Sequence, residues 1–177
     1  EHPGFELSGS GIVVDAHRGY IITTYHVIAA AADLMVVLPT GEELRATVVG
    51  SDPETDISVL RVRSTNLVEI TFGDSAKLEV GDYVVAVGNP FDLGPTVTLG
   101  IVSALGRDEL GLGPYENFIQ TDASLNPGNS GGALVDMDGA LIGVNSAIIA
   151  PAGGNVGVGF AIPVSIVRTV MERLISE

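Results

Sequence analysis

Short apolar runs separated by polar turns recur along the whole chain. The runs are rich in Val and Ile, and turn signals such as Arg18-Gly19, Asn89-Pro90 and Asp138-Gly139 divide them. Many short strands at this spacing indicate an all-β sandwich or barrel. The candidate strands are Ser10–Val14, Tyr20–Tyr25, Leu34–Leu38, Leu44–Val49, Ile57–Val62, Val68–Phe72, Tyr83–Val87, Val97–Leu105, Asn117–Thr121, Ala133–Val135, Ala140–Ile148 and Gly157–Ile162.

Two segments have helical patterns instead. His26–Ala32 is a short Ala-rich stretch that follows a predicted strand. Pro163–Ser176 begins with proline, and Val167, Val170 and Leu174 fall on one face at helical spacing. We expect this last helix to pack against a barrel and to have no catalytic role.

The polar stretches at residues 63–66 and 73–77 divide the strands into two halves of similar length. No linker is long enough to separate independent domains. The sequence therefore predicts a double β-barrel, with barrel one over about residues 8–72, barrel two over about 78–162 and a C-terminal helix at 163–176.

The composition excludes several classes of function. With 8 Lys and Arg against 22 Asp and Glu, the net charge of the 177-residue chain is −14. Such an acidic surface repels phosphate backbones and anionic lipids, which argues against nucleic-acid binding. A metal site is disfavoured because the chain has no cysteine and no two histidines at ligand spacing. No apolar run approaches the roughly 20 residues that span a bilayer.

The segment Asn126–Gly132 has the residues of a catalytic loop. Ser130 stands among glycines, which are costly in regular structure and useful where the backbone must bend or approach another group closely. Such a loop presents one hydroxyl and frees several backbone N–H groups, as a nucleophile with an oxyanion hole requires. Taken alone, the segment is equally compatible with a glycine-rich turn that contains an incidental serine.

A serine nucleophile requires a base, and the three histidines are not equivalent candidates. His2 lies near the terminus and His17 in a polar turn, whereas His26 follows a predicted strand and opens an apolar turn. Asp56 leads directly into the apolar strand Ile57–Val62, where a lone buried charge would be unfavourable. Asp122, just before the serine loop, is the alternative carboxylate.

The order His26, Asp56, Ser130 is that of a chymotrypsin-type triad and differs from the orders in subtilisin and the α/β-hydrolases. In a two-barrel fold the first two residues come from barrel one and the serine from barrel two. The site would then lie between the barrels.

The chain resembles the HtrA/Deg serine proteases, most closely the bacterial periplasmic DegP/DegQ type. The resemblance covers nearly the whole chain. It rests on the stretches Gly9–Val13, Gly19–Ile21, Thr55–Leu60, Gly88–Phe91, Gly100–Ala104, Asn117–Ser124, Gly128–Gly132 and Gly157–Pro163.

This resemblance implies a role for each matched residue. His26 is implied as the base, Asp56 as the orienting acid and Ser130 as the nucleophile, with the N–H groups of Gly128, Asn129 and Ser130 around the oxyanion. It also implies a trypsin-like double barrel, no cofactor, and homotrimers or higher oligomers seated on the N-terminal segment, with Phe5 as the contact. The implied substrates are unfolded or misfolded envelope proteins in the periplasm.

Two departures from the family pattern accompany the resemblance. Thr24 stands where the family usually has Asn before the catalytic histidine, which affects local geometry more than chemistry. The peptide-binding PDZ modules that follow the protease domain in these proteins are absent from this sequence. We therefore expect a bare protease domain, natural or trimmed. The chain starts at Glu1 rather than Met, so we expect that a leader or other N-terminal segment was removed or that this is an excised domain.

The serine loop also predicts regulation and specificity. Trypsin-like enzymes have an aspartate before the serine that pairs with the freed N-terminus, whereas Asn129 has no charge. We therefore expect activity to be governed by the glycine-rich loops at 107–116 and 149–156. Ser124, six positions before Ser130, lies at the base of the primary pocket in that fold. A pocket formed by Ser124, Leu125, Ile148 and Ile149 should prefer small or medium aliphatic side chains.

Other interpretations explain less of the sequence. The glycine-rich tract at 153–159 lacks the Lys-Ser/Thr ending of a P-loop. Its Gly157–Phe160 part is similar to the carboxylate-binding loop of PDZ modules, but a binding module leaves His26 and Asp56 unexplained. Two alternatives stay open: a chaperone or scaffold with the same fold, and a membrane-anchored, stress-sensing regulatory protease of the DegS type.

Overall fold

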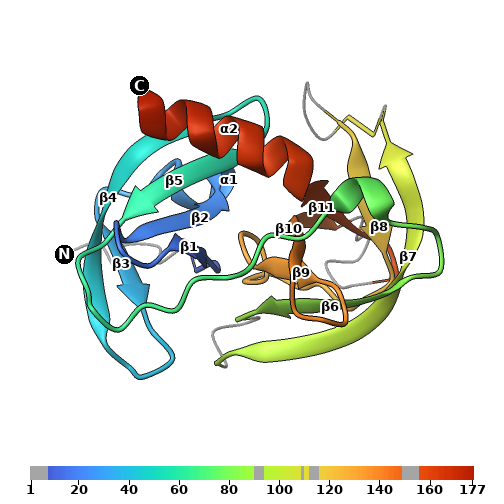
Figure 1. Cartoon of the computed structure of the whole chain (residues 1–177), viewed down its shortest axis with the longest axis horizontal. Helices are drawn as coiled ribbons and strands as arrows, with labels where there is room; N and C mark the ends of the chain where they lie inside the picture. Colours follow the sequence, from blue (N-terminus) through green and yellow to red (C-terminus); the bar gives the residue numbers. More distant parts are fainter. Residues whose placement is uncertain (1–7, 90–93, 109, 112–115, 149–155) are drawn as a thin grey trace.

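The computed structural model describes residues 8–89, 94–108, 110–111, 116–148 and 156–177. These residues form two antiparallel β-structures side by side, with a C-terminal helix lying across both (Figure 1). Among them, no helix is long and apolar enough to cross a membrane.

The first half is a five-stranded sheet in the order β1-β2-β5-β4-β3. Its strands are β1 (Ile12–Asp15), β2 (Tyr20–Thr24), β3 (Leu34–Val37), β4 (Glu43–Asp52) and β5 (Ile57–Arg61). The short helix α1 (Tyr25–Ile28) follows β2 directly. Buried Ile21, Ile28 and Leu60 belong to the core that the curled sheet encloses.

The second half is a closed barrel in the order β10-β11-β8-β7-β6-β9. Its strands are β6 (Tyr83–Gly88), β7 (Thr96–Arg107), β8 (Phe118–Thr121), β9 (Ala133–Val135), β10 (Leu141–Ile148) and β11 (Gly159–Pro163). Val84, Val102 and Leu134 are fully buried inside it. A single 3₁₀ turn, η1 (Ser75–Lys77), precedes this barrel.

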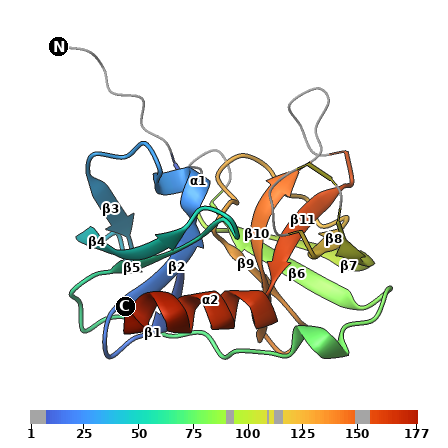
Figure 2. The ribbon, with the colours of Figure 1, turned by 90° about the horizontal axis from the view of Figure 1, so that it is seen from above.

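The helix α2 (Val164–Ser176) joins the two halves into one unit. It contacts β4 and β5 of the first half and β10 and β11 of the second. Its buried Val167 belongs to a core cluster that also includes Val59 and Val144, one from each half. Figure 2 shows α2 along one side of both halves, while α1 lies on the opposite side.

The all-β prediction with a C-terminal helix agrees with this architecture, and most strand boundaries differ by one to three residues. The first half differs in that its hydrogen-bonded order leaves β1 and β3 as edges. The predicted helix at 26–32 is shorter, ending at Ile28. Pro163 ends β11 and caps α2.

The predicted strand Val68–Phe72 is wrong. Only Phe72 forms a bridge, to Leu141, and Val68 is 85% exposed. The N–H of Ile70 bonds to Val13 in the first half, whereas Thr71 accepts a bond from Leu141 in the second. The segment crosses between the halves and pairs too briefly with either to extend a sheet.

Candidate active site

Three segments meet at the junction of the two halves. His26 lies on α1, Asp56 in the turn between β4 and β5, and Ser130 in the loop before β9. The turn is tied to α1 by a hydrogen bond from the Tyr25 N–H to the Asp56 carbonyl oxygen, at 2.9 Å. Ser146 on β10 bonds to both Ser130 and Asp56, so residues from both halves lie at one site.

Asp56 holds α1 with its main chain and with its carboxylate. Its φ of 59° lies in the left-handed region, and no other non-glycine residue in the described part of the chain has a positive φ. Its Oδ1 accepts the backbone N–H of His26 at 2.9 Å, and its Oδ2 lies 2.7 Å from Nδ1 of the same residue. These bonds offset a backbone strain of about 1–2 kcal/mol.

The His26 ring has one nitrogen, Nδ1, with a defined hydrogen-bond partner, and a second, Nε2, that is available. A carboxylate only accepts hydrogen bonds, so its contact with Nδ1 places the proton there and leaves the Nε2 lone pair available. The side chain is 50% exposed, against 26% for Asp56. An imidazole held in this way can take a proton at Nε2 while Asp56 stabilises the resulting cation.

The other candidates for base and acid lie elsewhere. His17 is in the exposed turn between β1 and β2, and His2 lies outside the described residues. The carboxylate of Asp122 accepts the Ile101 N–H at 2.8 Å. Thr24 is the buried N-cap residue of α1 and makes no side-chain capping bond, so the orientation of His26 depends on Asp56.

The Ser130 loop fits closely against the first half. Gly131 has a φ of +83°, and a Cβ added there would lie 2.2 Å from the Ser10 carbonyl oxygen. Its N–H donates to Asn145 of β10 at 2.8 Å, and the Ser10 N–H donates to the Ser130 carbonyl oxygen at 2.8 Å. The glycine that follows Ser130 is required by both its conformation and its lack of space.

The three N–H groups that the sequence assigns to an oxyanion are not equivalent. The N–H of Asn129 donates to the Asn126 carbonyl oxygen at 3.0 Å. Within the described parts of the chain, the N–H groups of Gly128 and Ser130 have no acceptor. Those two donors are available to a ligand, whereas Asn129 would first have to break its turn.

Ser146 on β10 links Ser130 to Asp56. Ser130 Oγ donates to the Ser146 carbonyl oxygen at 3.1 Å, and Ser146 Oγ donates to Asp56 Oδ2 at 2.9 Å. Sequence reasoning did not identify Ser146 or its neighbour Asn145. A signal was present, because two polar residues interrupt the apolar run at 141–148 and both are buried.

A pocket of about 240 Å³ opens beside Ser130. Its lining residues are Leu125, Asn126, Pro127, Asn129, Ser130, Asn145 and Ser146. Of the four predicted pocket residues, Leu125 is in this lining and Ser124 is not. Ile148 ends β10, and Ile149 lies outside the described residues, as do Phe5 and most of the loop at 149–156.

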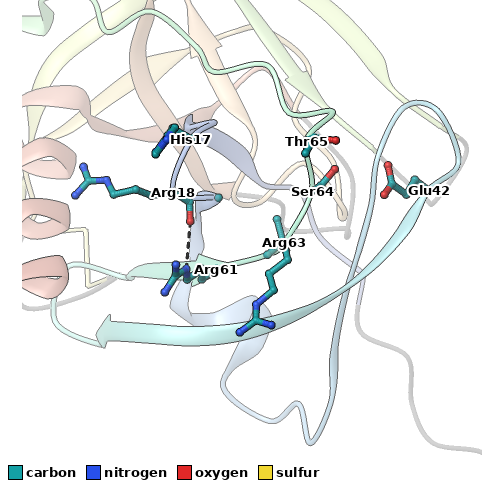
Figure 3. Close-up of a pocket in the computed structure, with 9 residues that line it drawn as sticks. His17, Arg18, Glu42, Arg61, Arg63, Ser64 and Thr65 are labelled. Carbon is teal, nitrogen blue, oxygen red and sulfur yellow. Dashed lines mark hydrogen bonds between the residues drawn. The ribbon is translucent and has the colours of Figure 1, made fainter.

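A second hollow, of about 500 Å³, lies on the first half away from these residues (Figure 3). Arg18, Arg61 and Arg63 line it, but the side chains of Arg18 and Arg63 point in different directions. The Arg18 N–H and guanidinium bind Asp15 and lower the pKa of its carboxyl group. Glu42 also lines the hollow, as the one carboxylate beside three arginines.

No group of three or more His, Cys, Asp or Glu side chains in the described ranges could hold a metal ion.

The model of the trypsin-like peptidase domain matches residues 9–144. The chain belongs to the trypsin-like peptidase family. This peptidase domain is 54% identical, over 97% of its length, to the periplasmic pH-dependent serine endoprotease DegQ of Escherichia coli. It is 52% identical, over 97% of its length, to the periplasmic serine endoprotease DegP of Salmonella typhimurium.

Solved structures of HtrA-type proteases are also similar to this chain. The HtrA-type protease AlgW with decapeptide superposes with a TM-score of 0.93 and 51% identity, over 96% of this peptidase domain. The match confirms the trypsin-like fold predicted from the sequence. The chain spans 38% of the length of DegQ, 36% of DegP and 52% of the AlgW chain.

Proposed function

We propose that this domain is a serine endopeptidase that cleaves unfolded polypeptides by acyl-enzyme chemistry. The observation that carries the proposal is the contact between His26 Nδ1 and Asp56 Oδ2, at 2.7 Å, beside the glycine loop that presents Ser130. The contact sets the tautomer and orientation that a general base needs. Membership of the trypsin-like peptidase family supports the same reaction.

In this mechanism Ser130 Oγ attacks the scissile carbonyl carbon and His26 Nε2 takes its proton. The protonated imidazole then gives that proton to the leaving amine, and water, activated by the same ring, hydrolyses the acyl-enzyme. The N–H groups of Gly128 and Ser130 bind the negative oxygen in both steps. Asp56 remains ionised and stabilises the imidazolium.

In this mechanism the Ser130 hydroxyl changes its hydrogen-bond acceptor before it attacks. Its Oγ donates to the Ser146 carbonyl oxygen in this structure, at 3.1 Å, instead of to His26. Rotation about χ1 exchanges one hydrogen bond for another, and catalytic hydrogen bonds commonly form only once substrate is bound. We therefore assign this arrangement to the resting enzyme.

We extend the proposal to substrate and location. The relatives DegQ and DegP are named periplasmic serine endoproteases, which supports a periplasmic protease acting on unfolded or misfolded envelope proteins. Leu125 in the pocket beside Ser130 supports a preference for small or medium aliphatic residues before the cleaved bond. Homotrimer formation through the N-terminal segment belongs to the same proposal.

A fluorophosphonate probe and casein digestion test the reaction. Covalent labelling at Ser130 should occur in the wild type and disappear in Ser130→Ala and His26→Ala, with casein cleavage lost in both variants. Labelling that persists in His26→Ala at the wild-type rate contradicts His26 as the base. Peptide-library cleavage with a strong preference after Lys or Arg contradicts the aliphatic pocket.

A second candidate is a regulatory protease that cuts one specific substrate. The close superposition on AlgW, an HtrA-type protease solved with a decapeptide, favours this candidate. Probe labelling at Ser130 without casein digestion would support it over the degradative enzyme.

A further inference from the structure

Ser10, just before β1, makes four hydrogen bonds at the junction of the two halves. Its N–H donates to the Ser130 carbonyl oxygen at 2.8 Å, and its carbonyl oxygen accepts Thr23 Oγ1 at 2.7 Å. Its Oγ donates to the Gly128 carbonyl oxygen at 2.7 Å and accepts the Asn89 N–H at 2.9 Å. One residue of the first half thus contacts both ends of the Gly128–Ser130 tripeptide.

The hydrogen bond from Ser10 Oγ is one of two that hold the peptide between Gly128 and Asn129. The peptide between Gly128 and Asn129 is bonded at its oxygen to Ser10 and at its N–H to Asn126. Gly128 has a φ of +97° and no side chain, so sterics alone leave this peptide free to rotate. Only hydrogen bonds select its orientation.

That peptide adjoins both N–H groups that are free to bind an oxyanion. The Gly128 N–H belongs to the peptide before it and the Ser130 N–H to the peptide after it. The peptide that follows Ser130 is bonded at both ends, to Ser10 and to Asn145. Rotation of the Gly128–Asn129 peptide changes ψ of Gly128 and φ of Asn129, which are torsions that set the angle between the two free donors.

The side chain of Asn129 does not replace this hydroxyl. Its Oδ1 is buried against Gly88 and has no hydrogen-bond partner in the described structure. Its Nδ2 reaches the Ser124 carbonyl oxygen only at 3.5 Å. With no charge, Asn129 also cannot anchor the loop through an ion pair.

We propose that Ser10 is a positioning residue whose hydroxyl orients the oxyanion-binding N–H groups of the Ser130 loop from the opposite half of the molecule. This inference rests on the proposed peptidase function and names a residue that acts through Gly128, without touching substrate.

The test compares Ser10→Ala with Ser10→Thr, which keeps a hydroxyl, and with the control Ser51→Ala. Ser51 accepts a hydrogen bond from Ser58 within the first sheet, and its loss leaves the Ser130 loop untouched. Ser10→Ala should lower kcat for a peptide substrate about tenfold, with KM within about twofold, since one positioning hydrogen bond is lost. Ser10→Thr should recover most of kcat, and Ser51→Ala should leave kcat unchanged.

Amide hydrogen exchange of Asn129 gives a readout that does not depend on activity. Its N–H should exchange roughly tenfold faster in Ser10→Ala, because the peptide it belongs to has lost one of two anchors. Unchanged exchange, or wild-type kcat and KM in folded Ser10→Ala, overturns the proposal.

If Ser10→Ala does not fold, Ser10→Cys, with a weaker donor of similar shape, is judged by the same two measurements. A wild type that neither labels nor cleaves refutes the peptidase function, while the exchange result still decides the role of Ser10.

Discussion

Single atoms carry the geometry of the candidate site. Asp56 uses its carbonyl oxygen, Oδ1 and Oδ2 for three different bonds to α1, and Oδ2 also accepts Ser146 Oγ. The carbonyl bond holds Tyr25, the Oδ1 bond holds the main chain of His26, and the Oδ2 contact sets the orientation and tautomer of its ring. A change of one atom at Asp56 should therefore affect catalysis more than folding.

Asp56→Asn makes that change. With Oδ1 still accepting the His26 N–H, the new amide nitrogen faces Nδ1 and selects the wrong tautomer, so we expect kcat to fall about 10⁴-fold. Asp52→Asn, four residues earlier on β4, is the matched control because Asp52 binds Arg173 of α2 and not His26. Steady-state kinetics measure the loss of activity in each variant, and thermal unfolding measures the loss of stability. Equal losses of kcat in both variants would contradict the role of Asp56.

Gly131 and Gly41 form a second matched pair. Their φ values are +83° and +85°, but an added Cβ meets the Ser10 carbonyl oxygen at 2.2 Å in Gly131 and nothing within 4 Å in Gly41. Gly41→Ala should cost about 1 kcal/mol of conformational strain. Gly131→Ala should cost about 3 kcal/mol or more, because the loop must also move away from the first half. Denaturant unfolding measures both, and equal losses would show that the loop is not tightly fitted.

The sequence predicted His26, Asp56 and Ser130, and the structure places them at one junction. Each has a local signal: a histidine at a strand end, an acid beside an apolar strand, a serine among glycines. Ser10 has no comparable signal, and the signal for Ser146 is only its polarity within the apolar run at 141–148. Their importance comes from contacts with residues far away in the chain, which only the packing of the two halves creates.

At the scale of elements, α2 is the part that joins the two halves. Its first turn lies near β11 and its last turn near β4, where Leu174 packs on Gly50. A Cβ on Gly50 would lie 3.1 Å from two atoms of Leu174, so the Leu174 side chain would have to shift by a few tenths of an ångström. The helix was predictable from its apolar spacing. Its position across both sheets was not, because one apolar face does not specify which sheet it covers.

Leu174→Ala tests the contribution of the last turn. Leu174 is 6% exposed, and its truncation should lower the free energy of unfolding by about 2–5 kcal/mol. Glu172→Ala, exposed on the same helix, should change it by no more than about 0.5 kcal/mol. Urea titration followed by circular dichroism gives both values. A neutral Leu174→Ala would mean that α2 is not required to hold the halves together.

At the scale of the whole molecule, the net charge is −14, and Asp56 is the one carboxylate among His26, Asp56 and Ser130. Electrostatic potential from the surface acts on a charged substrate before it reaches Ser130. The pocket beside Ser130 therefore selects the residue at the cleaved bond. The overall charge of the protein acts on the charges in the rest of the substrate polypeptide.

Two peptides with the same residue at the cleaved bond, one flanked by Lys and one by Glu, measure this effect. The Lys peptide should have about a tenfold higher kcat/KM at low salt, and the ratio should approach one near 0.5 M salt. An uncharged peptide serves as the control and should show little salt dependence. A ratio that salt does not change would point to direct contacts instead of long-range attraction.

The division of the site between two halves affects how the protein would cleave itself (autolysis). A fluctuation that parts the halves separates Ser130 from His26 and Asp56 while the hydrogen bonds within each sheet remain. On the proposed function, a molecule whose halves separate loses its activity and becomes a substrate for intact molecules. Autolysis then requires two molecules, and its rate rises with the square of the enzyme concentration.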